Sequence, residues 1–276
     1  MIILDPDDYV KARNPLKAVT INTLFVQAVV ERKIVGKIYV DNTDAPRTFL
    51  IYHPYGMSLL FGETGNEYFN ALFQNYSLNT FKVRQRYEWL QAFPDIWHDK
   101  LIGMFGEKLI KSKENIGNDQ NNRIEENTRV NFRFNKKKYF VFRSSIPDNK
   151  YLIHRTDKGM FEDMNGSVVP KYFWEDAEQF HKQGIGFSLF FEDNLASTAY
   201  SAFITKTQLE IGIETNQNNR GKGFAILTCA SLIDYCIDHN LEPVWSCKLE
   251  NIGSYLLAQK LGFEPTSYRP FYRLIS

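Results

Sequence analysis

The sequence predicts an α+β protein built in two parts, and three features carry this prediction. Runs with the two-residue alternation of strands and runs with helical spacing are mixed along the whole chain of 276 residues. A polar stretch at 112–127, whose large apolar residues are Ile116 and Ile124, divides the chain. Beyond it, an alternating run at 209–215 leads through a glycine-containing turn into a long apolar helix. We therefore expect an N-terminal α+β domain at 1–124 and a second domain at 125–276.

The composition allows a substantial core and argues against several classes of function. The hydrophobic fraction is 43%, with 22 Phe and 15 Tyr, which excludes a chain that is disordered throughout. A formal net charge of +1 gives no global field for nucleic acid or an anionic membrane, so neither is expected as a partner. A low, odd number of cysteines and an acidic N-terminus unlike a signal peptide favour a cytoplasmic protein. The histidines show no metal-ligand spacing, so no metal is expected.

The first part mixes short runs rich in β-branched and aromatic residues with runs of helical spacing. The β-rich runs predict strands at 23–31, 37–40, 48–53 and 57–61. Helical spacing predicts helices at 67–76, 87–93 and 95–108, and Pro94 separates the last two. No motif that bears chemistry is apparent in this part.

The second part has a clearer order of elements. Strands are expected at 129–134, 139–143, 186–191, 197–204, 209–215, 243–247 and in a final aromatic run to residue 274. The pair 186–191 and 197–204 is expected to form a hairpin across 192–194. Helices are expected at 171–181, 221–238 and 251–261. Gly262 should end the last helix in a left-handed conformation, with Phe263 packing back.

The segment 213–225 (IETNQNNRGKGFA) has the chemistry to hold a pyrophosphate. Its glycines let the backbone approach a ligand closely, and the following helix presents free amides and the positive end of its dipole. Arg220 and Lys222 add positive charge. An ordinary strand–loop–helix turn would show the same pattern. The segment is not a Walker A loop, because no Lys-Ser/Thr pair follows the glycines, and it lacks the third glycine of the dinucleotide fingerprint.

Two motifs in the second part resemble a known family. The pattern Arg220-x-x-Gly223-x-Ala225 is similar to the acyl-CoA signature of the GNAT N-acetyltransferase superfamily, Q/R-x-x-G-x-G/A. The run 251–263 (NIGSYLLAQKLGF) is similar to that superfamily's second signature. The longer pattern, with EIGIET before the loop and PVWSC after the helix, resembles the subfamily that includes the zwittermicin A resistance acetyltransferase.

This resemblance implies a GNAT fold in the C-terminal half, which is a mixed, mostly antiparallel sheet that is splayed between the strands 209–215 and 243–247 and flanked by helices. Acetyl-CoA, as co-substrate, would enter the splay. The order of strands and helices in the first half suggests a degenerate GNAT-like copy without the acyl-CoA motif, as one reading of that half. The residues implied in cofactor binding are Ile213, Thr215, Arg220, Gly221, Lys222, Gly223, Phe224, Ala225, Asn251 and Ser254.

The candidates for proton transfer lie on strand 209–215 and on the last helix. Glu210 is the first choice for a general base and Glu214 the second, although both also suit a solvated strand face. Family members often place a tyrosine acid where this chain has Ala258. Tyr255, one helical turn earlier, could substitute as the acid or could only pack. Alternatively, the thiolate leaves without a dedicated acid.

The strand that follows the long helix supplies candidates for the wall of a substrate pocket. Trp245 and Cys247 share one face of this strand and are expected to line the pocket. A covalent acyl-cysteine at Cys247 is disfavoured, because no histidine lies nearby in the sequence to activate the thiol.

Together these features predict an acetyl-CoA-dependent N-acetyltransferase that acts on a primary amine of a small molecule by direct attack. The subfamily resemblance suggests an aminopolyol-like compound or an antibiotic, and hence a role in antibiotic resistance. The alternative is a non-catalytic acyl-CoA-binding or regulatory module, which Ala258 keeps open. Acetylation of a protein or RNA is disfavoured, because no basic docking surface is evident. A homodimer is left open.

Overall fold

The computed structural model of the chain describes residues 1–82, 84–112, 123–146 and 151–275. Most of the predicted dividing stretch, at 113–122, lies outside the described residues. Contacts divide the chain into two compact units. Unit 1 comprises residues 1–129, 248–250 and 268–276, and unit 2 comprises 130–247 and 251–267. The prediction of domains at 1–124 and 125–276 stays a prediction.

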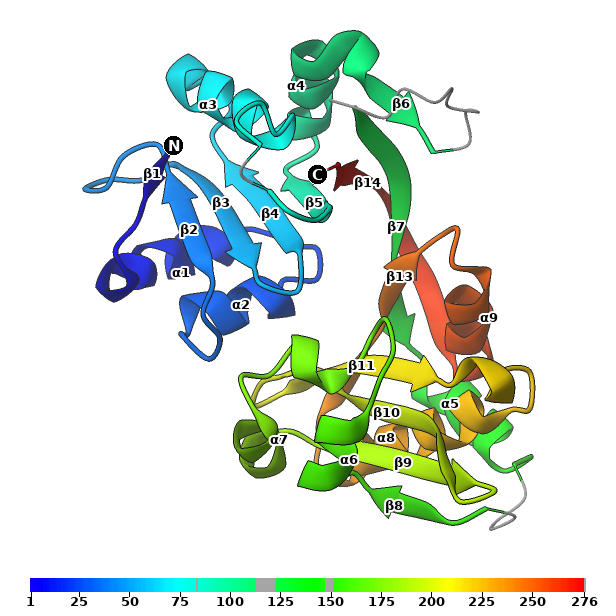
Figure 1. Cartoon of the computed structure of the whole chain (residues 1–276). Coiled ribbons are helices and arrows are strands. Elements are labelled where there is room, and N and C mark those ends of the chain that lie inside the picture. The colour runs from blue at the N-terminus through cyan, green and yellow to red at the C-terminus, as the bar shows by residue number, and fades with distance from the viewer. Residues whose placement is uncertain (83, 113–122, 147–150, 276) are drawn as a thin grey trace. The chain divides into compact units, whose positions relative to one another are not determined.

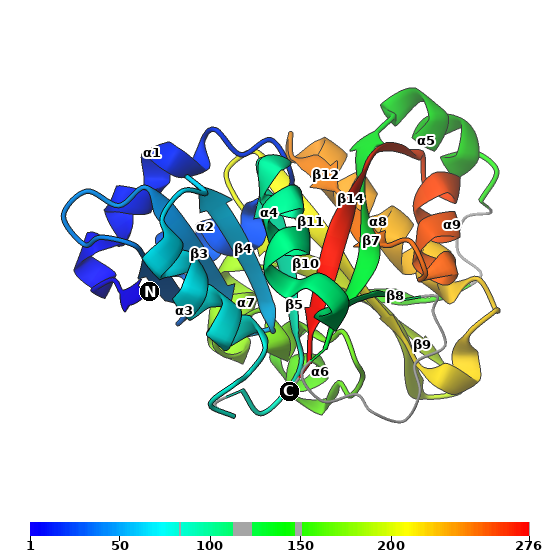
Figure 2. The ribbon, with the colours of Figure 1, turned by 90° about the horizontal axis from the view of Figure 1, so that it is seen from above.

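Unit 1 is built on a sheet with helices on both faces (Figures 1 and 2). Helix α2 packs on strands β3 and β4, while α3 and α4 share a core with the other face. From the N-terminus to the fifth strand, its elements are β1 (Ile2–Ile3), η1 (Pro6–Ala12), α1 (Arg13–Leu16), α2 (Leu24–Val30), β2 (Lys37–Val40), β3 (Thr48–His53), β4 (Met57–Gly62), α3 (Glu67–Ser77) and β5 (Glu88–Phe93). They are followed by α4 (Ile96–Phe105), η2 (Gly106–Lys108), β6 (Leu109–Lys111) and β7 (Ile124–Phe134).

Unit 2 contains the five-stranded sheet β12-β11-β10-β9-β8. Its elements begin with α5 (Lys136–Arg143), β8 (Ile153–Arg155), α6 (Lys158–Asp163), η3 (Pro170–Tyr172), α7 (Ala177–Gln183), β9 (Gly186–Phe191) and β10 (Asn194–Ile204). They continue with β11 (Gln208–Thr215), η4 (Gln217–Asn219), α8 (Phe224–Asp238), β12 (Glu242–Val244) and α9 (Ile252–Lys260). Strands β7, β13 (Ser246–Lys248) and β14 (Phe263–Leu274) each have residues in both units.

In the described part of the chain, the larger sheet has nine strands, and its strands β1 to β5 are arranged in the same order as the five strands of the smaller sheet. In unit 1, β1 to β4 are neighbours and antiparallel, and β5 then pairs parallel to β4. In unit 2, β8 to β11 are neighbours and antiparallel, and β12 then pairs parallel to β11. A helix, α3 or α8, connects each parallel pair, as such a crossover requires. This agreement is what a second GNAT-like copy in the first half requires.

The core of unit 2 lies between α8 and one face of its sheet. Helix α8 packs on β9, β10 and β11. The shared cluster includes Ala199 from β10, Leu209 and Ile211 from β11, and Leu232 and Ile233 from α8. On the opposite face, the η3 region covers the sheet (Figure 1), where Phe173 packs against Tyr200 with ring centroids 5.8 Å apart. Helix α8, which begins within the glycine motif at 220–225, is therefore packed firmly against β11, the strand that leads into this motif.

Most predicted elements are confirmed, with small shifts at their ends. The hairpin of β9 and β10 turns at Glu192 and Asp193, which both have positive φ. Gly262 has φ +84°, and the buried Phe263 joins the core of unit 2, as predicted. The predicted helix at 171–181 is instead two short pieces, η3 and α7. The predicted helix at 221–238 begins only at Phe224.

Three predicted elements are of the wrong type. The run at 23–31 forms helix α2, because its β-branched residues are buried against β3 and β4. The run at 87–93 forms the central strand β5, which pairs with β4 and with the end of β14. The run at 139–143 belongs to helix α5, whose N-cap Asn135 accepts a hydrogen bond from the Lys138 amide at 3.1 Å. In the first two cases long-range packing outweighs local propensity, whereas in the third a local cap starts the helix.

Within the described residues, no helix combines the length and the apolar character that crossing a membrane would require.

Candidate functional site

Strand β11 presents two chemically different faces. Leu209 and Ile211 are buried in the core beneath α8, and Ile213 packs against the same core. Glu210, Gly212 and Glu214 therefore point to the opposite face, because side chains alternate along a strand. The apolar face of this strand is therefore the core face.

Strand β11 loses its parallel neighbour at Glu210. The pairing with β12 runs from Gln208 opposite Glu242 to Glu210 opposite Val244. At the next residue, the Trp245 carbonyl accepts a hydrogen bond of 3.2 Å from the Phe132 amide of β7. The segment 246–248 then continues as β13 in the other sheet. The single strand predicted at 243–247 is therefore two strands, and the splay that the resemblance implies opens at Glu210.

The Glu210 carboxylate lies at this opening and is held by a serine. Glu210 is 7% exposed, and the Ser246 hydroxyl donates a hydrogen bond of 2.9 Å to its Oε1 atom. Ser246 is not among the candidate residues predicted from the sequence. Strand alternation could have pointed to it, because Ser246 lies between Trp245 and Cys247, which share one strand face, and its own side chain is therefore on the other face.

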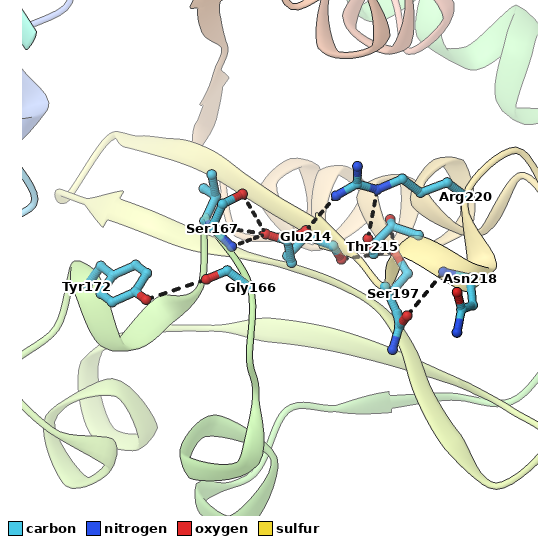
Figure 3. A network of polar contacts seen from close by, with 10 residues as sticks. Gly166, Ser167, Tyr172, Ser197, Glu214, Thr215, Asn218 and Arg220 are labelled. Carbon is cyan, nitrogen blue, oxygen red and sulfur yellow. Dashed lines mark hydrogen bonds and ion pairs between the residues drawn. The ribbon is translucent and has the colours of Figure 1, made fainter.

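The glycine loop, residues 216–223, is ordered by its own polar side chains. The Asn216 carboxamide accepts a hydrogen bond from the Asn218 amide at 3.2 Å (Figure 3). The buried Asn219 accepts one from the Lys222 ammonium at 2.9 Å. The Arg220 Nε atom donates to the Thr215 carbonyl at 3.2 Å. Both positive groups thus lie near the end of β11.

The first turn of α8 is open to an anion. Its N-cap is Gly223, which adopts φ +85° and has no side chain to satisfy the free amides of the turn. Gly221 has φ +79°, and a Cβ at either glycine would meet no described atom within 4 Å. Amides at a helix start, together with Arg220 and Lys222, suit a pyrophosphate. Phe224 is buried, so only its backbone can take part.

A chain of hydroxyls anchors this turn to the sheet. Ser197 of β10 lies 2.9 Å from the Thr215 hydroxyl and 3.3 Å from the Thr228 hydroxyl of α8. Thr228 also donates to the Phe224 carbonyl at 3.2 Å. The helix start, the end of β11 and β10 are therefore joined directly beneath the glycine loop.

The second motif supports α9 and its neighbour Trp245. Asn251 is the N-cap of α9 and accepts a hydrogen bond from the Ser254 amide at 3.2 Å. The Ser254 hydroxyl accepts one from the Trp245 indole at 3.2 Å. A direct role of Asn251 and Ser254 in cofactor binding stays a prediction. Ala258 is fully buried, so the position that often carries a tyrosine in the family belongs to the core.

The remaining predicted residues lie in packed surroundings. The Tyr255 ring packs against Phe132 with centroids 5.5 Å apart. Trp245 and Cys247 are 2% and 6% exposed and belong to the core of unit 2. Their role as a pocket wall stays a prediction. The three cysteines are free and buried, and burial raises the pKa of the Cys236 thiol to about 12.

Glu214 differs from Glu210 because the protein itself occupies its carboxylate. The Oε2 atom accepts hydrogen bonds from the amides of Ser167 and Val168 at 2.8 and 2.9 Å (Figure 3). Its Oε1 atom lies 3.4 Å from the Arg220 guanidinium. The segment 166–168 could not be predicted as part of the site, because no local pattern in the sequence connects it with β11.

Comparisons with known proteins agree with this geometry. The family model described as GNAT acetyltransferase matches residues 14–272. A relative from Bacillus subtilis (strain 168), the uncharacterized N-acetyltransferase YdfB, is 26% identical over 252 residues, which cover 90% of this chain and 89% of the relative.

Two solved structures are similar over nearly the whole chain. A GCN5-related N-acetyltransferase-like protein from Streptococcus suis 89/1591 has a TM-score of 0.68 at 19% identity, with 97% of this chain and 99% of that chain covered. A tandem GNAT protein from the clavulanic acid biosynthesis pathway has a TM-score of 0.62 at 11% identity, with 99% and 97% covered. Both show the same fold, and the second supports an arrangement of two GNAT-like domains. With a family model that spans both units, the chain belongs to the GNAT acetyltransferase family of enzymes, which transfer an acyl group from acyl-CoA.

Proposed function

We propose that the protein transfers an acetyl group from acetyl-CoA to a primary amine of a small molecule, by direct attack within a ternary complex. The observation that carries the proposal is the arrangement along β11. The glycine loop follows one end of the strand, and the buried Glu210 marks the point where β12 leaves it. The five residue-to-residue steps from 210 to 215 span about 17 Å of strand. An extended pantetheine arm anchored at the loop can therefore lie along the edge that β12 leaves uncovered.

The proposed contacts to acetyl-CoA follow from this placement. The amides at the start of α8 and the side chains of Arg220 and Lys222 would hold the pyrophosphate. The backbone of Ile213 and Thr215 would pair with the pantetheine arm, as a neighbouring strand would. These assignments are supported by the open first turn of α8 and by the end of the β11–β12 pairing at Glu210.

Glu210 is the proposed general base. A primary amine is mostly protonated at neutral pH, so it must lose a proton before it attacks. The amine nitrogen forms a bond to the thioester carbonyl carbon, and the carbon–sulfur bond breaks with its electron pair leaving on sulfur. Glu210, directly or through one water, takes the proton that the ammonium group loses before the attack. The second proton, lost by the nitrogen as the amide forms, passes through water to solvent or to the departing sulfur. In this proposal the CoA thiolate leaves without a dedicated acid: the Tyr255 ring packs against Phe132, Ala258 is buried, and Tyr255 as the acid is the alternative.

The acceptor class rests on the resemblance and not on the geometry. The zwittermicin A resistance subfamily, which the sequence resembles, suggests an aminopolyol-like compound or an antibiotic. A role in antibiotic resistance and a cytoplasmic location belong to this proposal. The free, buried cysteines are consistent with a reducing compartment.

The test combines binding with turnover. Purified protein is assayed for CoA release with acetyl-CoA and a panel of aminopolyols and simpler primary amines, beside Glu210→Gln. We expect at least one amine to be acetylated and Glu210→Gln to lower kcat by about 100-fold or more, with the Kd for acetyl-CoA unchanged. Tight binding of acetyl-CoA without turnover of any amine would instead favour a non-catalytic acyl-CoA-binding module. Unimpaired turnover by Glu210→Gln would remove Glu210 as the base.

A further inference from the structure

The carboxylate of Glu214 holds a segment that is distant in sequence. Its Oε2 atom accepts the amides of Ser167 and Val168 at 2.8 and 2.9 Å and lies 3.2 Å from the Ser167 hydroxyl (Figure 3). The side chain is only 11% exposed. Two backbone amides converging on one carboxylate oxygen are charge-assisted hydrogen bonds, which are stronger than neutral ones. Glu214 therefore fixes the segment 166–168, which we call the covering loop, against β11.

The same carboxylate also reaches the glycine loop. Its Oε1 atom lies 3.4 Å from Nη2 of Arg220, while Nε of that arginine donates to the Thr215 carbonyl. The arginine side chain is 62% exposed, and 3.4 Å is a long hydrogen bond. This contact is therefore weak while the guanidinium faces solvent. Glu214 is nevertheless in contact with both loops.

The backbone at Gly166 lies so close to the Glu214 carboxylate that a side chain has no room there. A Cβ built at Gly166 would lie 2.6 Å from Oε2 and 2.7 Å from Cδ of Glu214. Contacts this short are not tolerated, so any side chain at position 166 would displace the carboxylate from the amides of the next two residues. The hydrogen bonds from Ser167 and Val168 to Glu214 thus require that position 166 carries no side chain.

The covering loop lies on the catalytic face of β11. Glu214 and Glu210 are alternate residues on one side of the strand, separated by Gly212, so the covering loop and the proposed base share a face. An amine that binds beside Glu210 would therefore share this face with the covering loop.

We infer that Glu214 is a positioning residue that couples the acetyl-CoA site to the covering loop, so that bound acetyl-CoA stiffens the loop and raises the affinity for the amine. The inference rests on the proposed function, since it needs a pyrophosphate at the glycine loop. A pyrophosphate restricts the exposed Arg220 side chain, and a fixed guanidinium holds the Glu214 carboxylate against the covering loop. Rigidity is thereby passed between sites without a change of fold.

Amide hydrogen exchange at Ser167 and Val168 tests the coupling without any turnover. We expect saturating acetyl-CoA to slow exchange at both amides by about 5-fold or more, the lower range of coupling between sites. In Glu214→Ala, both amides should exchange faster, and acetyl-CoA should no longer change their rates. Unchanged or faster exchange on adding acetyl-CoA to the wild type, with binding confirmed by calorimetry, would overturn the coupling alone. Absence of acetyl-CoA binding would instead refute the proposed function.

Gly166→Ala perturbs the contact without removing the charge. It should displace the carboxylate and abolish the effect of acetyl-CoA on Ser167 and Val168, as Glu214→Ala does. In the Glu214→Ala background the added methyl group meets no carboxylate, so Gly166→Ala should cause little further change. Additive effects of the two substitutions would show that they act independently and would contradict the inference.

Steady-state kinetics separate positioning from base catalysis. Glu214→Ala should raise KM for the amine by about 5-fold or more and change kcat little, whereas a lost base lowers kcat. Glu175→Ala removes an exposed glutamate of the same unit and serves as the matched control, with no change expected in either constant. A fall in kcat as large as that of Glu210→Gln, with KM unchanged, would make Glu214 a base and not a positioning residue.

Discussion

The Ser246 hydroxyl donates a 2.9 Å hydrogen bond to the Glu210 carboxylate, although the two residues belong to strands of different sheets. Ser246 is the first residue of β13, which follows β12 directly in the chain. Glu210 is the last residue of β11 that pairs with β12. The bond therefore spans the point where the strands part and orients the proposed base there.

Ser246→Ala should leave Glu210 in place without its donor. We expect kcat to fall by about 10-fold or more, because a hydrogen bond to a charged group contributes roughly 1.5–3 kcal/mol, with the Kd for acetyl-CoA unchanged. Ser246→Thr keeps a hydroxyl and should restore most of the activity. Steady-state kinetics on both variants provide the measurement. Equal losses in the two variants would show that the hydroxyl does not matter.

Arg220→Ala should weaken acetyl-CoA binding, since it removes a cation beside the open first turn of α8. The expected rise in Kd, by isothermal titration calorimetry, is about 10-fold or more. Lys260→Ala, which removes an exposed cation at the end of α9, is the control and should bind like the wild type. An unchanged Kd in Arg220→Ala would place the pyrophosphate elsewhere.

The Tyr255→Phe substitution distinguishes two possible roles of Tyr255, that of a general acid and that of a packing residue. The ring packs against Phe132 and would keep that contact as phenylalanine. We expect kcat within a few-fold of the wild type, because a general acid would contribute about 100-fold or more. Tyr255→Ala should lower thermal stability instead, through the lost packing. A large fall in kcat for the phenylalanine variant would restore the tyrosine as the acid.

The chain should bind one molecule of acetyl-CoA, because unit 1 lacks the features that open unit 2. The start of α3 is capped by the Asn66 side chain, which accepts the Phe69 amide at 3.0 Å, and it carries Glu67, whose negative charge repels a phosphate. Strands β4 and β5 also stay paired from Met57 to Phe61, so no splay opens. Calorimetry should give a stoichiometry of one. Two sites would show that the first copy has kept its function.

Stability should fall in mild acid because of His53. Burial lowers the pKa of this fully buried histidine from 6.5 to about 3. Below about pH 6.5 the unfolded chain takes up a proton that the native side chain does not accept, so the free energy of unfolding falls as pH falls toward 3. The loss at about pH 5 relative to pH 8 is about 2 kcal/mol. Urea midpoints across this range should fall less steeply in His53→Asn. Parallel curves would contradict the assignment.

The sequence shows local chemistry well and long-range contacts poorly. The glycine loop and the helix stop at Gly262 were predictable, because each depends on a few neighbouring residues and their backbone conformations. The expectation of two parts came from the polar stretch at 112–127. Helix α2 was missed because its β-branched residues favour a strand until β3 and β4 bury them.

The polar contacts of the site were predictable only in part. Glu210 could be chosen from strand alternation, but the partner Ser246 depends on where β12 and β13 divide. Glu214 was chosen by the same alternation, although its carboxylate is occupied by the amides of Ser167 and Val168. These contacts join segments that no periodic pattern relates.

The end of β14 has a consequence for how the protein is made. Residues Tyr272, Arg273 and Leu274 pair with β5 and belong to unit 1, although the whole of unit 2 lies between them and β5 in the sequence. While the ribosome synthesises the chain, β5 has to wait for this partner until residues 272–274 have been translated. The nascent first unit would thus expose a strand edge while unit 2 is being made, when an unpaired edge invites aggregation. Substitutions that break the pairing of 272–274 with β5 should then harm the solubility of the newly made protein more than the acetyl-CoA site itself.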